Sequence, residues 1–352
     1  MPGGFPDTPG APDPAARFDD ALGRVDADAA VGVVDGLLDA GADPLGVLVD
    51  VIAAGLRRIG ERWQRAEWTV AQEHAATAVA VVATRAVARH AERVPATRGH
   101  VVVACAEREW HALPATIIAC ALRTAGWETT LLGAATPARR LSQYLHDLGP
   151  DAVAVSCSVL GSLPATRHFI EAGTAAGIPV LVGGAAFGPD PVRALALGAT
   201  AWAPDARAAV AAVAELPAVV PTAPALPQAV TAEQAALELA HDRLAADLRV
   251  RWSPTAGVVG TPPLDGIDGV VGSVVDQALH ATSAALLTGD TRALSWTADW
   301  ARALLAARGA DPALVTELGD LLTAALPEFP LALDLVERHW DRGLTTSGHL
   351  PT

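Results

Sequence analysis

Five short apolar runs alternate with helical stretches through the middle of the chain. The runs cover residues 100–105, 128–132, 151–157, 178–182 and 199–202. Strands that alternate with helices form parallel sheets with right-handed crossovers, because each helix returns the chain to the same end of the sheet. A continuous apolar run such as 101–104 is typical of a strand that is buried on both faces. The pattern therefore predicts a doubly wound, five-stranded parallel sheet over residues 99–216.

Polar and small residues stand at the end of three of these runs or shortly after it. They are Glu109, His111, Ser156, Ser158, Gly183 and Gly184. We expect a flavodoxin/Rossmann-like domain whose doubly wound sheet has the order 2-1-3-4-5, in which the first, third and fourth strands are neighbours. Ligands bind at the carboxyl ends of such strands, so we expect His111, both serines and both glycines to line one crevice.

These motifs resemble the D/E-x-H-x-x-G, S-x-L/T and G-G signature of cobalamin-binding domains, and 41 residues separate Pro114 from Ser156, as in that family. The resemblance implies that His111 replaces the cofactor's own dimethylbenzimidazole as the lower axial ligand of cobalt. The displaced nucleotide tail would enter a slot lined by the serines and glycines, with Phe187 packed near it. An imidazole whose tautomer is fixed by a carboxylate is a good cobalt ligand, and glycines let a bulky tail approach the backbone.

The chain departs from this signature at one position, because Pro114 stands where the family has a glycine. Proline fixes φ near roughly −65°, lacks an amide donor and disfavours the helical conformation at the residue before it. We therefore expect an extended Leu113 and a turn after His111 that differs from the family's.

Helical periodicity upstream of the sheet predicts a four-helix bundle over residues 15–94. Trp63, followed after nine residues by Glu73 and His74, matches the W-x9-E-H motif of light-sensing adenosylcobalamin proteins of the CarH type. The resemblance implies that the bundle caps the upper face of the corrin ring. It also implies that these three side chains surround the adenosyl group.

The resemblance to cobalamin-binding proteins does not cover the last third of the chain. A proline-rich linker is predicted at 217–229 and a helical C-terminal domain at 230–352, while the Pro/Gly-rich residues 1–14 are expected to be a disordered tail. Helices are predicted at about 231–251, 268–287, 291–308, 312–325 and 330–341, with a loop at 254–266. This C-terminal segment has 16 acids and 8 arginines, so we expect no direct nucleic-acid binding.

Composition excludes further classes of function. The net charge is −14 and the chain contains no lysine, which rules out Schiff-base chemistry and a P-loop lysine. The three cysteines lie in apolar runs without metal-ligand spacing, so we expect them to be buried. The N-terminus has neither a basic segment nor an apolar core, and no apolar run reaches the ~20 residues that cross a bilayer. We therefore expect a cytoplasmic protein without a signal peptide or membrane contact.

Three functions fit these motifs. The preferred one is a cobalamin-binding sensory or regulatory protein that is not an enzyme, with adenosylcobalamin favoured over methylcobalamin and light as the signal. The tail before residue 15 is too short for the helix-turn-helix domain of CarH-type proteins, so the output is expected to pass through the C-terminal domain to an unidentified protein partner or to self-association. The alternative is a corrinoid carrier subunit of a methyltransferase system, which shares the architecture and the axial histidine. The third is a scaffold whose cobalamin site has decayed, with Pro114 as the symptom.

Overall fold

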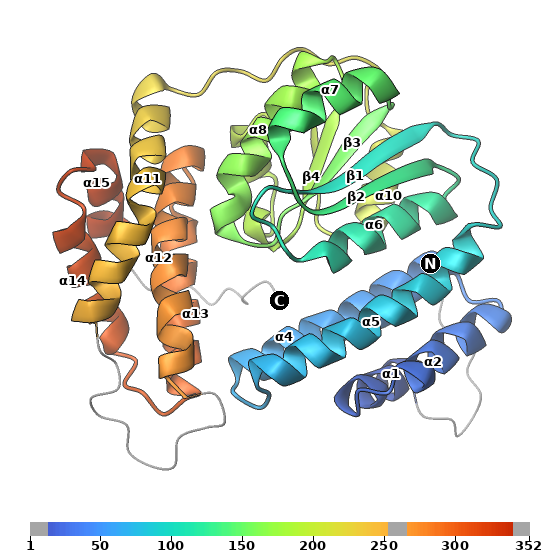
Figure 1. Ribbon diagram of the computed structural model, residues 1–352, viewed down its shortest axis with the longest axis horizontal. Coiled ribbons are helices and arrows are strands. Elements are labelled where there is room, and N and C mark those ends of the chain that lie inside the picture. Colours follow the sequence, from blue (N-terminus) through green and yellow to red (C-terminus); the bar gives the residue numbers. More distant parts are fainter. Residues whose placement is uncertain (1–12, 253–265, 341–352) are drawn as a thin grey trace. The chain divides into compact units, whose positions relative to one another are not determined.

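The structure is a computed structural model that describes residues 13–252 and 266–340 (Figure 1). The predicted tail before Asp13 and nearly all of the predicted loop 254–266 lie outside the described residues. The chain divides into two compact units. The N-terminal unit comprises Met1–Glu61 and Ala71–Ala223, and the C-terminal unit comprises Arg62–Val70 and Pro224–Thr352. The short segment Arg62–Val70 thus groups with helices that follow it by more than 150 residues.

A five-stranded parallel sheet lies at the centre of the N-terminal unit. Its strands are β1 (His100–Ala106), β2 (Glu128–Thr136), β3 (Ala152–Ser156), β4 (Val180–Gly183) and β5 (Ala201–Ala203). The strand order is β2-β1-β3-β4-β5 and all four pairings are parallel, which confirms the predicted sheet and its topology. Every residue of β3, and every residue of β1 after His100, is buried, as the continuous apolar runs indicated.

Helices cover both faces of this sheet (Figure 1). One face carries α6 (Ala112–Thr124) and α10 (Ala206–Ala214), and the other carries α7 (Ala138–Leu148) and α8 (Leu163–Ala175). Between sheet and helices, apolar side chains such as Val103, Leu122 and Val213 form a buried core. Three short helical pieces complete the domain: η2 (Leu160–Ser162), η3 (Ala185–Phe187) and α9 (Val192–Ala196).

The predicted helical cap precedes the sheet and, apart from Arg62–Val70, belongs to the same unit. Its elements are α1 (Pro14–Gly23), α2 (Ala27–Asp39), α3 (Pro44–Gly46), the π-helix η1 (Val47–Ala53), α4 (Ala54–Gln64) and α5 (Val70–Ala91). Asp43 caps the third helical segment, because its side chain accepts hydrogen bonds from the amides of Leu45 (3.3 Å) and Gly46 (3.2 Å). The π-helix contacts α6 and α10, and Arg207 of α10 donates to Asp50 over 3.0 Å. These contacts join the cap to the α/β domain.

The helices of the C-terminal unit match the predicted ones within a few residues. They are α11 (Gln228–Arg251), α12 (Asp268–Thr288), α13 (Arg292–Ala306), α14 (Leu314–Ala325) and α15 (Pro330–His339). Two buried indoles tie them together, because the Nε1 of Trp252 donates to the carbonyl of Leu314 (2.9 Å) and that of Trp340 to Val315 (3.0 Å). A buried indole N–H needs such a partner, so these bonds fix how α14 packs.

One helix in the described part of the chain, Gly269–Thr288, has the length and composition to cross a membrane, with a mean hydropathy of 1.2. This differs from the expectation that no apolar stretch is long enough. Most of this stretch is buried inside the C-terminal unit, where α12 packs against α11, α13 and α15.

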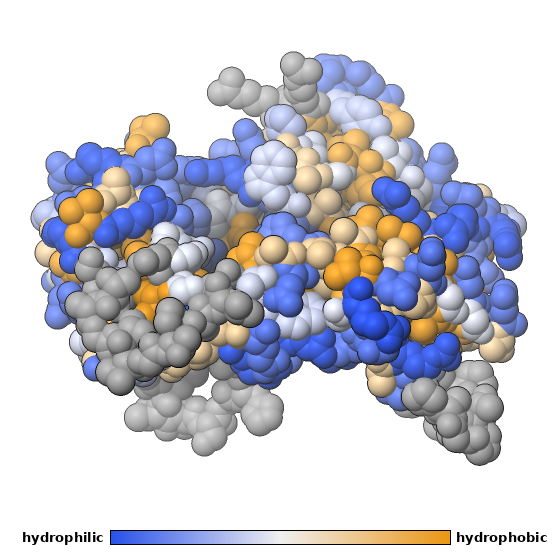
Figure 2. Space-filling view, turned by 60° about the horizontal axis from the view of Figure 1, so that its bottom comes forward, coloured by the Kyte–Doolittle hydropathy of each residue, from blue (hydrophilic) through white to orange (hydrophobic). Residues whose placement is uncertain are grey.

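On the visible face of that unit, at the left of Figure 2, hydrophilic side chains surround single apolar ones. Leu239 and Val250 are the most exposed of its large apolar residues.

Candidate functional site

The carboxyl ends of four strands align at one edge of the sheet. Cys105 pairs with Ser156, Ser156 with Gly183, and Gly183 with Ala203. The loops that carry the predicted polar residues therefore leave the sheet side by side. His111 lies five residues after β1, as the residue that precedes the first turn of α6.

The carboxylate of Glu109 joins two of these loops. It has no exposed surface and accepts hydrogen bonds from four N–H groups. Its Oε1 binds the amide (2.8 Å) and Nδ1 (2.7 Å) of His111, and its Oε2 binds the amides of Ser158 (2.5 Å) and Val159 (3.1 Å). Burial raises the pKa of Glu109, but these bonds to His111 and Ser158 outweigh it and hold the pKa below its usual value. Glu109 is thus an ionised clamp between the loop after β1 and the loop after β3.

The imidazole of His111 is held at one nitrogen and exposed. Its side chain is 61% exposed, and the bond from Nδ1 to Glu109 leaves the lone pair of Nε2 as the ring's available metal ligand. The pKa of His111 is raised, chiefly by this hydrogen bond and against the effect of burial, and the charges of Glu109 and Glu73 add to the increase. Glu73 lies on α5, so a charge on the helical cap contributes to the raised pKa of His111.

Further contacts hold the loop between β1 and α6. The amide of Glu109 donates to the carbonyl of Ala106 (3.0 Å), and the Glu109 carbonyl accepts from the amide of Ala135 (2.9 Å). The thiol of Cys105 donates to the carbonyl of His111 over 3.6 Å. Burial, with a contribution from Glu109, raises the pKa of Cys105 to about 12, so this thiol stays protonated. Arg108 has a φ of 73°, a conformation that non-glycine residues seldom adopt and that these contacts enforce.

Pro114 does not force the residue before it into an extended conformation, as was expected. Helix α6 begins at Ala112, so Leu113 and Pro114 are both helical, and the prediction of an extended Leu113 is wrong. Pro114 is the third residue of the helix, where an N–H group has no intrahelical acceptor. The missing donor therefore costs the helix nothing, and the residue four positions earlier, Trp110, precedes the helix and leaves room for the ring.

Gly183 and Gly184 are required by the protein's own backbone. A Cβ at Gly183 would lie 2.5 Å from the carbonyl oxygen of Ala203, and one at Gly184 would lie 2.4 Å from that of Cys157. Gly184 also has a φ of 107°. The two glycines thus let the loops after β3 and β5 approach the end of β4, in addition to any space they leave for a ligand.

The remaining predicted residues of this edge differ in how far a ligand can reach them. Ser156 is buried at the end of β3, whereas Ser158 is partly exposed and uses its backbone amide to hold Glu109. Phe187 has no exposed surface, so in this structure it packs inside the domain and supports the loop from within. The guanidinium of Arg193, buried and absent from the predicted site, donates to the carbonyl of Ala186 (2.7 Å) and holds the same loop.

The residues of the W-x9-E-H motif fall in both units. Glu73 and His74 lie in the first turn and a half of α5, where Nδ1 of His74 is 2.6 Å from Oε2 of Glu73. The imidazole of His74 is 73% exposed, and Glu73 also accepts from the hydroxyl of Thr77 (3.3 Å). Trp63 belongs to the C-terminal unit, and its Nε1 has no hydrogen-bond partner among the described residues.

Two family models match this arrangement. Residues 15–87, which hold the helical cap, and residues 99–214, which hold the sheet, each match a model described as a B12 binding domain. This chain is a B12-binding protein. The cap and the B12-binding α/β domain occur in the order that the two sequence motifs predicted.

Curated relatives include a transcriptional repressor and a corrinoid protein. The HTH-type transcriptional repressor CarH of Myxococcus xanthus is 36% identical over 158 residues, which are 44% of this B12-binding chain and 52% of the repressor. The chain thus spans about half the length of that relative. Trimethylamine corrinoid protein 1 of Methanosarcina acetivorans is 25% identical over 179 residues, 48% of this chain and 82% of the relative.

Among solved structures, the monomethylamine corrinoid protein of Methanosarcina barkeri shares the fold. It superposes with a TM-score of 0.50 at 18% identity, over 56% of this chain and 95% of the other. At this identity the likeness concerns architecture alone.

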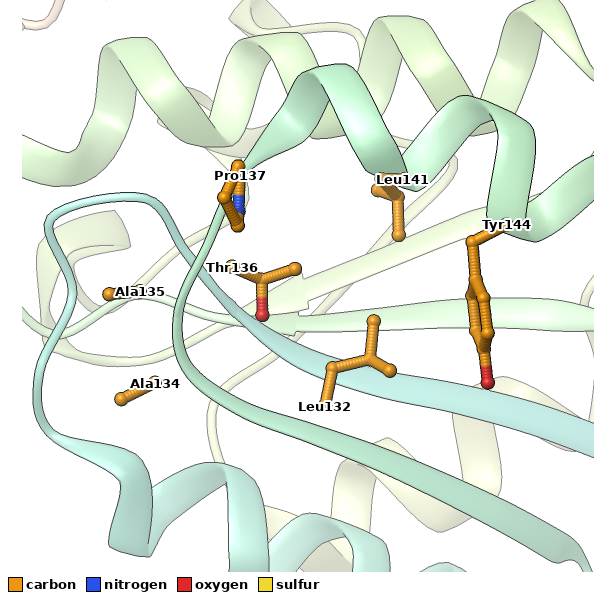
Figure 3. A pocket seen from close by; sticks show the side chains of 7 residues that line it. All are labelled: Leu132, Ala134, Ala135, Thr136, Pro137, Leu141 and Tyr144. Atoms are coloured by element: carbon orange, nitrogen blue, oxygen red, sulfur yellow. The ribbon is translucent and has the colours of Figure 1, made fainter.

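A shallow pocket of about 380 Å³ lies between β2 and α7 of the B12-binding domain (Figure 3). Its lining is largely apolar and consists of Leu132, Ala134, Ala135, Thr136, Pro137, Leu141 and Tyr144. Because the amide of Ala135 bonds to the carbonyl of Glu109, the pocket is tied to the loop that carries His111. This surface could not be predicted from the sequence, because none of its residues belongs to a motif.

Proposed function

We propose that the protein is a cytoplasmic, adenosylcobalamin-dependent sensor that responds to light and signals through its C-terminal unit to a protein partner or to another copy of itself. The observation that carries this proposal is the Glu109–His111 pair. A buried, saturated carboxylate holds Nδ1 of an exposed imidazole, which is the arrangement that prepares a histidine for an axial metal bond. The acidic C-terminal segment disfavours direct contact with nucleic acid.

In this proposal Nε2 of His111 would bind the cobalt of the cofactor, and Glu109 would hold the imidazole ring in place. Ser156, Ser158 and the glycine pair border the slot for the nucleotide tail. Glu73, His74 and Trp63 contact the adenosyl group on the upper side. The cofactor, when bound, supplies a cobalt–carbon bond that light can cleave. Contacts that exist with one upper ligand and not with another are what a switch requires.

A corrinoid carrier for a methyltransferase is the second candidate. The trimethylamine corrinoid protein supports it, because this chain covers 82% of that relative. The sensor is favoured by Trp63, Glu73 and His74, which complete the W-x9-E-H motif. A decayed site is disfavoured by the complete set of hydrogen bonds around Glu109.

Absorbance spectra of the purified protein with adenosylcobalamin and with methylcobalamin test the proposal. A sensor is expected to bind the adenosyl form about one to one in the dark with a histidine-ligated spectrum, to prefer it over the methyl form, and to change oligomeric state or partner binding on illumination. A carrier is expected to prefer the methyl form and to lose its methyl group to a thiol acceptor only when a methyltransferase is added. Absence of a histidine-ligated spectrum at saturating cofactor would reject both.

Replacing Trp63 is expected to alter selectivity more than affinity. An indole offers a large flat apolar surface to an adenine or ribose ring, and a methyl group makes little use of it. We expect Trp63→Ala to reduce the preference for adenosyl- over methylcobalamin by at least about tenfold, as is common when a buried aromatic contact is removed. Competition titrations measure this preference. Trp68→Ala is the control, because Trp68 occupies the same turn and stacks under Arg62 at 4.8 Å; an equal loss in both variants would make Trp63 a packing residue.

A further inference from the structure

Arg308 is a buried arginine at the end of α13, and only 1% of its surface is exposed. It follows the last turn of that helix and precedes Gly309, whose φ of 77° ends the helix. Its Nη1 donates to the carbonyl of Leu304 (3.2 Å) in its own helix. A fully buried guanidinium is rare unless its N–H groups donate hydrogen bonds, so further acceptors are expected around Arg308.

The other acceptors of Arg308 are at the end of a cap helix. Its Nη2 donates to the carbonyl of Trp63 (3.0 Å) and its Nη1 to the carbonyl of Gln64 (3.2 Å), which are the last two residues of α4. The guanidinium also lies over the indole of Trp63, 5.5 Å from the ring centre. Arg308 thus contacts both the backbone and the ring of one residue that lies 245 positions earlier in the sequence.

Physical chemistry explains why a cation suits this position. The last four carbonyls of a helix lack intrahelical partners, and the carboxyl end carries a partial negative charge. Arg308 satisfies carbonyls at the ends of α4 and α13 together, and its planar fork reaches two of them at once, which a lysine cannot do. The turn after α4 uses the same acceptor, because the amide of Ala66 also donates to the Trp63 carbonyl (3.0 Å). Ala66 has a φ of 57° in this turn.

We propose that Arg308 is a positioning residue that makes the Trp63 turn part of the C-terminal unit, so that the state of the cobalamin upper ligand is passed from Trp63 to helices α13 and α14. The transmission half of this inference rests on the proposed function, in which Trp63 contacts the upper ligand. The attachment half does not, because it follows from the contacts of Arg308 alone. A change of ligand that moves the indole must also change the cation–π and carbonyl contacts of Arg308.

Hydrogen–deuterium exchange of the full-length protein tests both halves. Without cofactor, Arg308→Met is expected to speed exchange in residues 62–70 by at least about tenfold, because the turn loses charged donors to two carbonyls. Arg243→Met is the matched control, since it removes a surface arginine of the same unit that pairs with Glu328 at 3.0 Å, and it is expected to change nothing in this segment. Arg308→Lys keeps the charge and the fold and is expected to fall between wild type and Arg308→Met. Unchanged exchange of residues 62–70 in both Arg308 variants would overturn the attachment.

The second measurement adds adenosylcobalamin in the dark. Wild type is expected to change its exchange in residues 62–70 and in residues 301–315, whereas Arg308→Met and Arg308→Lys are expected to keep the first change and lose most of the second. A structural role alone would not remove this ligand-dependent response. An equal response of residues 301–315 in all variants would overturn the transmission. Spectra of the same samples report cofactor binding separately, so a failure of cobalamin to bind is recognised as a failure of the proposed function, while the cofactor-free arm still decides the role of Arg308.

Discussion

Replacing His111 by alanine is expected to abolish the histidine-ligated spectrum of bound cobalamin and to weaken binding by at least about 100-fold. Loss of a single outer partner of a metal ligand costs 10–100-fold in affinity, and loss of the ligand itself removes the bond that this partner supports. The 61% exposure of the side chain means that the substitution creates no cavity, so the protein should stay folded. Titration followed by absorbance measures both effects.

A matched control uses another histidine of the same domain. His168 on α8 is exposed and belongs to no motif, so His168→Ala is expected to bind cobalamin as wild type does. If His111→Ala keeps the wild-type spectrum and affinity, the axial assignment is wrong. If both variants lose binding equally, the effect comes from a general loss of structure.

Glu109→Gln is expected to reduce both stability and cofactor affinity. The two oxygens of Glu109 face N–H groups only, so an amide NH2 on either arm would meet donors instead of acceptors. Lost charge-assisted bonds outweigh the relief from burying a charge, and we expect a decrease of about 3 kcal/mol in the free energy of unfolding. The freed ring of His111 should bind cobalt about 10–100-fold more weakly.

Urea unfolding and cobalamin titration measure these two effects. Glu107→Gln is the control, because Glu107 is exposed in the same loop and should tolerate the change within about 0.5 kcal/mol. Glu109→Asp keeps the charge but shortens the side chain by one methylene, so it should retain the bonds on one oxygen and rank between wild type and Glu109→Gln. A Glu109→Gln protein as stable as wild type would show that the carboxylate is not the clamp between the β1 and β3 loops.

Local and periodic features of the sequence predicted most of the fold. Apolar runs such as Val101–Ala104 and the helical stretches between them fix a parallel sheet, and chain connectivity then leaves few strand orders. The alignment of Ser156 with Gly183 at one edge followed from that topology alone and is confirmed by the register, and His111 follows the neighbouring strand. These features depend on residues close in sequence or on a general rule of chirality.

The features that the sequence did not predict depend on where a helix begins or on backbone contacts between distant segments. Pro114 suggested an extended turn, but the helix begins early enough to place proline where its missing donor has no effect. Ser158 bonds to Glu109 through its backbone amide, and no side-chain pattern in the sequence indicates such a bond. The attachment of Arg308 to Trp63 spans 245 residues and involves carbonyl groups, which every residue has. Neither Arg308 nor the carbonyl groups that accept its hydrogen bonds can be recognised from the sequence.

A bond between Nε2 of His111 and the cobalt of bound cobalamin can be detected by electron paramagnetic resonance. The protein is prepared with histidine labelled with nitrogen-15, and bound cobalamin is reduced to the cobalt(II) state, whose unpaired electron couples to the axial nitrogen. If His111 is the ligand, each cobalt hyperfine line is expected to be split by the axial nitrogen into a doublet in the labelled protein and into a triplet in the unlabelled one. A triplet in the labelled protein would show that the cofactor's own base remains bound, and it would contradict the assignment of His111.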